Sequence, residues 1–139
     1  MSDPMTGSEQ GKTTIADTVV SKIAGIAARE VSGVHALGGS TARAVGALRE
    51  RIPGGRTNQS QGVAVEVGER EAAVDLELIA EYGVSITDLA AGIRRNVISA
   101  IERMTGLDVT EVNIVVQDVY VPPAREDDAD DASDVPRVQ

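Results

Sequence analysis

Apolar residues near the start of the chain recur at steps of three or four, the spacing of one face of an amphipathic helix. The residues on this face are Ile15, Val19, Ile23, Ile26, Ala27 and Val31. Thr14 followed by Asp17 has the pattern of a capping box at a helix start, and Gly33 is expected just past the helix end. The pattern predicts a helix over residues 15–32, followed by a short strand over 34–37.

The pattern changes to alternation of apolar and polar residues between positions 63 and 82, which indicates strands with one buried face. The apolar positions are Val63, Val65 and Val67, then Val74, Leu76, Leu78, Ala80 and Tyr82. A short polar turn over 68–71 separates the two runs. We therefore expect a β-hairpin that buries one of its faces.

Helical spacing returns over residues 86–105. Ser85 followed by Asp88 repeats the capping pattern, and Gly106 marks the end of the helix. The positions predicted to be buried are Leu89, Ala90, Ile93, Val97, Ile101 and Met104. A last strand is predicted over 109–121, before the two prolines that follow it.

These elements combine into a β-β-α-β unit. A strand-helix-strand crossover should be right-handed and should place the last strand parallel within the sheet. We expect an α+β fold, in which a small mixed sheet is made of the hairpin and a parallel crossover strand. The amphipathic helices should pack on one face of this sheet.

The remaining segments define the domain organisation. We expect one folded domain over residues 13–123, a flexible N-terminal segment over 1–12 and a disordered acidic tail over 124–139. The tail has six acidic residues, two arginines and hardly any large apolar side chain. Within the domain, residues 38–61 interrupt the regular pattern, with a short helix predicted over 41–52 and a polar loop over 56–61.

Composition excludes several classes of protein. The chain has 139 residues and a net charge of −9, whereas binding to phosphates requires a clustered excess of Lys and Arg. Its two tyrosines are its only aromatic residues, which leaves no stacking platform for single strands, and without cysteine it has no thiol nucleophile. No apolar run reaches the roughly 18 residues of a membrane helix, and the polar N-terminus lacks the features of a signal peptide. We expect a cytoplasmic protein that does not insert directly into the membrane.

Candidate catalytic and ligand-binding patterns are weak. Residues 7–13 (GSEQGKT) have three residues between their glycines, where a phosphate-binding loop has four, and no apolar strand pattern precedes them. His35, the single imidazole, is expected to be a partly buried strand residue rather than a general base. Asp75, Glu77 and Glu81 alternate along a strand, which is more typical of a solvated face than of a metal site. We expect no catalytic, cofactor-binding or metal-binding residues, no enzymatic activity and no small-molecule substrate.

Charge is distributed unevenly along the chain. Residues 43–56 hold four arginines against one glutamate, and residues 66–81 hold six acidic residues against one arginine. Oppositely charged patches can direct self-association or partner choice, although two unrelated solvated faces would give the same pattern. A second basic patch lies in the helix predicted over 86–105. The candidate interaction surface comprises Arg43, Arg49, Arg51, Arg56, Glu66, Asp75, Glu77, Glu81, Arg94 and Arg95.

Three segments resemble a known family in their order and separation. They are V-x-V-x-V-G-E…V-D-L in the hairpin, then E-Y-G-V-S-I, then M-T-G-L-D-V-x-E-V-N-I. Together with the leading helix that ends in R-E-V-S-G-V-H-A-L, they cover about residues 13–122. This stretch closely resembles the alkaline shock protein family, the Gls-type envelope stress response proteins of Gram-positive bacteria.

The resemblance implies a non-enzymatic protein of the cytoplasm that lies close beneath the membrane and is linked to cell-envelope stress. It also implies self-assembly, and recruitment to the membrane by a separate membrane-anchored protein partner. No catalytic residues are carried over. We therefore expect a self-associating scaffold, and the alternative is a nucleic-acid-binding stress regulator that uses the Arg-rich segment 43–56.

Overall fold

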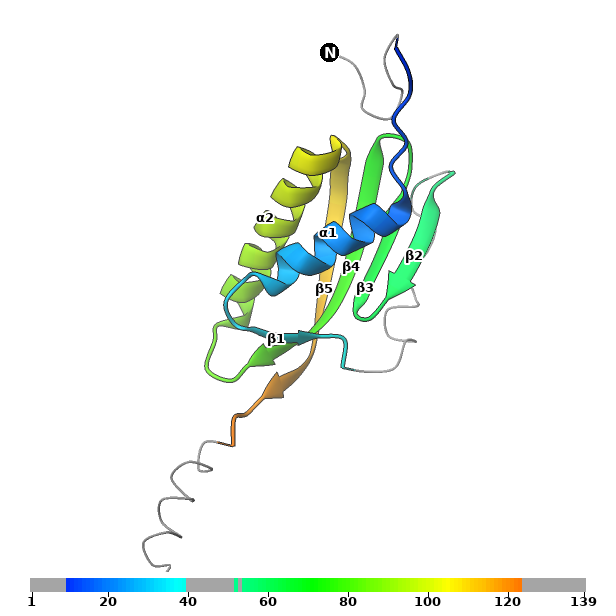
Figure 1. The fold of residues 1–139 in the computed structure, drawn as a ribbon. Coiled ribbons are helices and arrows are strands. Elements are labelled where there is room, and N and C mark those ends of the chain that lie inside the picture. Colours follow the sequence, from blue (N-terminus) through cyan, green and yellow to red (C-terminus); the bar gives the residue numbers. More distant parts are fainter. Residues whose placement is uncertain (1–9, 40–51, 53, 124–139) are drawn as a thin grey trace, which may run out of the picture.

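The computed structural model describes residues 10–39, 52 and 54–123, which form two layers (Figure 1). The elements are α1 (Asp17–Arg29), β1 (Val34–Leu37), β2 (Arg56–Ser60), β3 (Val63–Val67), β4 (Glu71–Glu81), α2 (Ile86–Thr105) and β5 (Asp108–Tyr120). Both helices lie across the same face of a sheet formed by the five strands (Figure 1). The predicted α+β class, with helices on one face of a small sheet, is confirmed.

Strand β4 is the centre of the sheet. It pairs with β5 in parallel along its whole length. Its other edge is shared by two antiparallel strands, with β3 paired to residues 72–76 and β1 paired to residues 78–80. Strand β2 pairs with β3 and adds the outermost strand on that side.

Two glycines meet where β1 and β3 adjoin along β4. The Gly38 N–H donates to the carbonyl oxygen of Glu77 at 2.7 Å, and the Glu77 N–H donates to the carbonyl oxygen of Gly62 at 2.8 Å. Both glycines have positive φ, 87° and 76°. Glu77 of β4 thus holds the ends of both neighbouring strands through its backbone, at a point that has no room for a side chain on Gly62.

The core lies between the sheet and the two helices. Alternate residues of β4 from Ala72 to Ala80 have no exposed surface, and the three valines of β3 pack beside them. The helices contribute Val20, Ile23, Ala24, Ala27 and Ala28 from α1, and Leu89, Ile93, Val97 and Ile101 from α2. Burying one such valine, leucine or isoleucine contributes about 1.5–3 kcal/mol, so this layer supplies most of the stability.

The first helix differs from its sequence prediction in its start, its end and its buried face. It begins after Ala16, which makes no side-chain cap, and it ends at Arg29, so neither the Thr14 cap nor the Gly33 terminus is correct. Val19 and Ile26, predicted to be buried, are 44% and 52% exposed. The buried face consists largely of small residues, three of them alanines, because small side chains let the helix lie close to the sheet. A pattern read from bulky residues alone misses such a face.

The other elements agree more closely with the sequence. Strands β1 and β3 are confirmed, and α2 begins and ends as predicted, with the Ser85 hydroxyl accepting from the Asp88 N–H at 3.3 Å. Met104 was predicted to be buried but is 63% exposed, because the buried row of α2 continues from Ile101 to Thr105 and leaves Met104 outside it. The helix predicted over 41–52 lies outside the described residues apart from its last position. The predictions for the two tails also fall largely outside them.

Strand β2 was missed, because the sequence predicted a polar loop over 56–61. Its residues, RTNQS, carry no apolar alternation, yet all five pair with β3 in antiparallel register. Polar residues suit an outer strand because such a strand makes few contacts with the core. They also keep its exposed edge soluble. Strand β4 also begins at Glu71, three residues before the first valine of its predicted run.

Replacing Gly92 with alanine should stabilise the protein by about 0.5–1 kcal/mol, because glycine inside a helix costs this much conformational entropy relative to alanine. An added Cβ would meet Val31 Cγ1 at 3.7 Å and Arg95 Nη2 at 3.8 Å, which are ordinary contacts. Urea unfolding measures the change. The matched control, Ala91→Gly on the exposed side of the same turn, should destabilise by a similar amount. Destabilisation by both changes would show that the α1–α2 contact is tighter than described.

Candidate functional site: the charged surfaces

The sheet face away from the helices is acidic. Parallel pairing puts each residue of β4 on the same face as its partner in β5, so the register identifies the members of this face. Its acidic members are Glu71, Asp75, Glu77 and Glu81 from β4, and Asp108, Glu111 and Asp118 from β5. Strands β3, β4 and β5 contain no lysine or arginine. We call these seven residues the acidic face; the three from β5 were missed by sequence reasoning, which considered only residues 66–81.

Neutral side chains hold two of the carboxylates in place. Asn113 Nδ2 donates to Asp75 Oδ1 at 3.1 Å, and Gln117 Nε2 donates to Glu77 Oε2 at 2.7 Å. Both amides come from β5, so they cross-link the two strands on this face. An amide carries no charge, so these two bonds orient the carboxylates without adding a positive charge beside them.

Two acidic residues of the predicted interaction surface are buried. Glu66 has no exposed surface, and its Oε2 accepts a hydrogen bond from the Ile52 N–H at 2.9 Å. Glu77 is 1% exposed and is bonded to Gln117. The prediction that these two side chains form part of an exposed surface is therefore wrong. Alternation along a strand does not show whether another segment of the chain covers one of its faces. Asp75 is half-buried and Glu81 is exposed.

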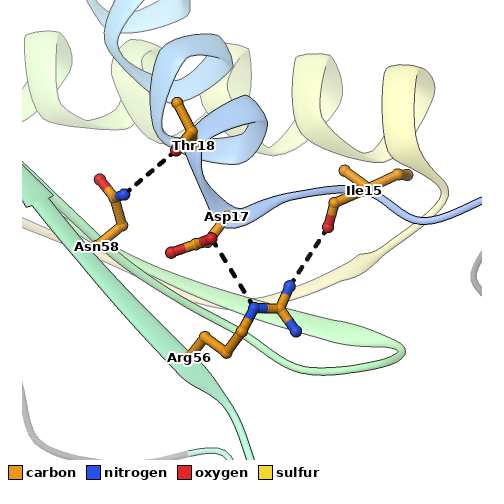
Figure 2. Close-up of polar contacts among 5 residues, drawn as sticks. All are labelled: Ile15, Asp17, Thr18, Arg56 and Asn58. Atoms are coloured by element: carbon orange, nitrogen blue, oxygen red, sulfur yellow. Dashed lines mark hydrogen bonds and ion pairs between the residues drawn. The ribbon is translucent and has the colours of Figure 1, made fainter.

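Arg56 fastens β2 to the start of α1 (Figure 2). Its Nε lies 3.8 Å from Asp17 Oδ1, and its Nη2 donates to the carbonyl oxygen of Ile15 at 3.3 Å. Asn58 Nδ2 donates to Thr18 Oγ1 at 3.5 Å beside it. Half-exposed ion pairs contribute at most about 1 kcal/mol, so the cluster fixes the angle of the helix more than it adds stability. The other predicted arginines of this patch, Arg43, Arg49 and Arg51, lie outside the described residues.

The two arginines that were predicted to form a basic patch on α2, Arg94 and Arg95, have different roles. Arg94 Nε donates to the carbonyl oxygen of Val112 at 3.1 Å, and Glu102 Oε2 accepts from the Val109 N–H at 3.0 Å. Both side chains therefore bond the backbone of β5, which within the described residues pairs only with β4. Such contacts protect the open edge of an outer strand. Arg95 remains exposed and lines a hollow of about 490 Å³ between the helices.

A basic groove lies between α1, β1 and the turn that joins β2 to β3. Its volume is about 730 Å³, and Lys22, Arg29 and His35 are among its lining residues. Gly25 and Leu37 contribute to its apolar lining, so it combines an apolar floor with a cationic rim. Sequence reasoning missed it, although the seven-residue spacing of Lys22 and Arg29 puts both on one side of a helix. We call these lining residues the basic groove.

His35 is exposed, not partly buried as predicted. Its ring stacks on that of Tyr120, with 3.8 Å between the ring centroids and 5° between the planes. The stack joins β1 to the end of β5, so Tyr120 contacts a residue that lines the basic groove.

The described residues hold charged surfaces rather than a constellation typical of catalysis. Among residues 10–39, 52 and 54–123, no three His, Cys, Asp or Glu side chains gather closely enough to ligate a metal. In the same part of the chain, neither helix has the length and apolarity needed to cross a bilayer. An acidic face on one side of the sheet and a basic groove on its helix side are suited to binding charged macromolecular partners.

Comparison with known proteins identifies the family. YqhY of Bacillus subtilis is 38% identical over 104 residues, which cover 75% of this chain and 73% of that protein. A stress response regulator gls24 homolog of Streptococcus pyogenes is 34% identical over 118 residues, which cover 85% of this chain but only 64% of that protein, less than two thirds. YloU of Bacillus subtilis is 29% identical over 117 residues, which cover 80% of this chain and 90% of that protein. No solved structure matches.

The sequence pattern of one family matches residues 5–121, which include every described helix and strand. This family is that of alkaline shock protein 23, and it is described as having a cell envelope-related function. The match and the gls24-type relatives confirm the resemblance to the alkaline shock and Gls-type stress proteins. The chain belongs to the alkaline shock protein 23 family of cell envelope-related proteins.

Proposed function

We propose that the protein is a non-enzymatic, self-associating scaffold of the envelope stress response, held at the cytoplasmic side of the membrane by a protein partner. The observation that carries the proposal is the acidic face, where six exposed or half-buried carboxylates and the buried Glu77 share one side of β4 and β5 without a lysine or arginine in either strand. Such a surface repels copies of itself and attracts a basic surface. The family and its stress-related relatives support the cellular setting.

The complementary surface is the Arg-rich segment 43–56, which holds four arginines against one glutamate. Contact between this segment of one copy and the acidic face of another would join unlike surfaces of the two copies. Contacts of this type are heterologous, and they propagate into rings or open filaments rather than stopping at a dimer. Repeated head-to-tail contact would give a scaffold many identical attachment points.

A protein partner is the better route to the membrane. With a net charge of −9, the protein is repelled by the anionic lipids of the inner leaflet. Attachment through a membrane-anchored partner avoids this repulsion. Recruitment by a partner would also concentrate the chain on one surface, which favours self-association by mass action.

The structure gives less support to a nucleic-acid-binding regulator. Of the arginines that such a protein would use, Arg56 is paired with Asp17, and Arg94 is bonded to the backbone of β5. The acidic face would also repel phosphates.

Reversing the charge at both ends of the acidic face should disperse assemblies. Glu71→Lys with Glu81→Lys changes two exposed residues of β4, so the fold should be retained. Sedimentation velocity should show the large species of the wild type replaced by the monomer. The matched control is Glu30→Lys with Asp88→Lys, which alters the net charge equally but lies in the helix layer. Equal dispersal by both variants would contradict a specific acidic contact, as would retention of the assemblies in the first variant.

A further inference from the structure

The basic groove has the shape and chemistry of a site for an acidic peptide. Ser21 and Ser60, whose Oγ atoms lie 3.5 Å apart, line the groove together with His35. Gly25 is buried, and an added Cβ there would lie 3.6 Å from Arg29 Nη1 and from Val63 Cγ2 and 3.7 Å from Leu37 Cδ1, so this part of the lining is closely packed. An acidic peptide can lie over this lining with its carboxylates at the cationic rim.

The end of β5 contacts one of the residues that line this groove. Tyr120 stacks on His35, and residues 121–123 follow it on the surface. The next segment is the acidic tail, whose acidic residues are Glu126, Asp127, Asp128, Asp130, Asp131 and Asp134. This acidic run therefore begins six residues after Tyr120, which contacts a residue of the groove lining, and the short tether raises its effective concentration there.

The geometry points to the basic groove as the docking site of the chain's own acidic tail, with residues 126–131 lying along α1. Lys22 and Arg29 are seven residues apart, a rise of about 10 Å along a helix. Five extended residues span about 17 Å, so the run from 127 to 131 covers both cations. Its carboxylates complement the charges of Lys22 and Arg29.

Docking in this manner gives the tail a defined role that is separate from self-association. The groove lies on the helix side of the molecule, whereas the proposed assembly uses the acidic face. A tail held in the groove neutralises the two cations of α1, so the surface offered to partners becomes more uniformly negative. The inference does not rest on the proposed scaffold function.

The natural chain has no cysteine, so a single spin label can be placed in the tail. We would use the full-length protein with Ala129→Cys and measure the loss of amide signal intensity across the domain. Docking predicts strong losses at Lys22, Ile26, Arg29 and Ala36. These losses should disappear at about 1 M salt, where screening acts within about 3 Å. They should also disappear in Lys22→Glu with Arg29→Glu.

The matched control is Arg95→Glu with Arg103→Glu, which reverses two exposed cations of α2 and should leave the losses unchanged. A second variant changes the six tail acids to Asn and Gln, so the folded domain stays intact while the losses vanish. Losses confined to the end of β5, or losses that survive charge reversal in the groove, would overturn the inference. So would losses that appear only when labelled chains are mixed with unlabelled ones, since the groove would then bind the tail of another copy.

Discussion

Replacing Gly62 with alanine is expected to destabilise the protein by about 3 kcal/mol, enough to remove a large fraction of the stability of a small domain. The position has φ of +76°, and an added Cβ would overlap the Gly38 nitrogen and lie 2.8 Å from the Glu77 carbonyl oxygen and 2.9 Å from the Gly38 Cα. All three contacts are backbone, so no flexible side chain can move aside. Relief would require β1 and β3 to separate where both are bonded to Glu77.

Urea unfolding of Gly62→Ala measures this cost, and Gly54→Ala is its matched control. Gly54 has nearly the same φ, +75°, but nothing lies within 4 Å of an added Cβ. The control should therefore report only the backbone strain of a left-handed residue, about 1 kcal/mol. Equal losses in both variants would mean that β1 and β3 do not approach each other as closely as described.

Truncating Ile93 should cost roughly 2–5 kcal/mol, because its side chain is fully buried in the middle of α2 and alanine would leave a cavity. Arg95→Ala, two residues away on the exposed side, should cost little. Arg94→Ala should fall between them, since it removes the hydrogen bond to the Val112 carbonyl. Thermal or urea unfolding of the three variants gives the comparison. Similar costs at Ile93 and Arg95 would show that the buried face of α2 is misassigned.

The parts of the fold that the sequence predicts well are those where bulky apolar residues and capping residues agree. Helix α2 has both, with Leu89, Ile93, Val97 and Ile101 inward, Ser85 at its start and Gly106 at its end. Helix α1 has alanines on its buried face, so the bulkier Val19 and Ile26 suggested a different orientation. The orientation of such a helix is decided by how closely it can approach the sheet, which is a tertiary property.

Polar segments are harder to predict. Strand β2 has no apolar pattern, and it exists because β3 offers an edge with which to pair. The charged surfaces required the register between strands that are far apart in the chain, since Asp108, Glu111 and Asp118 join the acidic face only through pairing with β4. The basic groove likewise needs α1, β1 and the β2–β3 turn together. Runs of charged residues in the sequence predicted charged surfaces, but they could not distinguish the buried Glu66 from the exposed Glu81.

Self-association through complementary charge is measured by sedimentation velocity of the wild-type protein over a range of concentrations and salt. Charge-driven contact predicts large species at low salt that dissociate as salt is raised, because exposed charges are screened beyond about 8–10 Å at moderate ionic strength. A protein that stays monomeric at high concentration and low salt would contradict self-association. Assemblies that grow with salt would contradict its electrostatic origin equally, because they would indicate apolar rather than charged contacts.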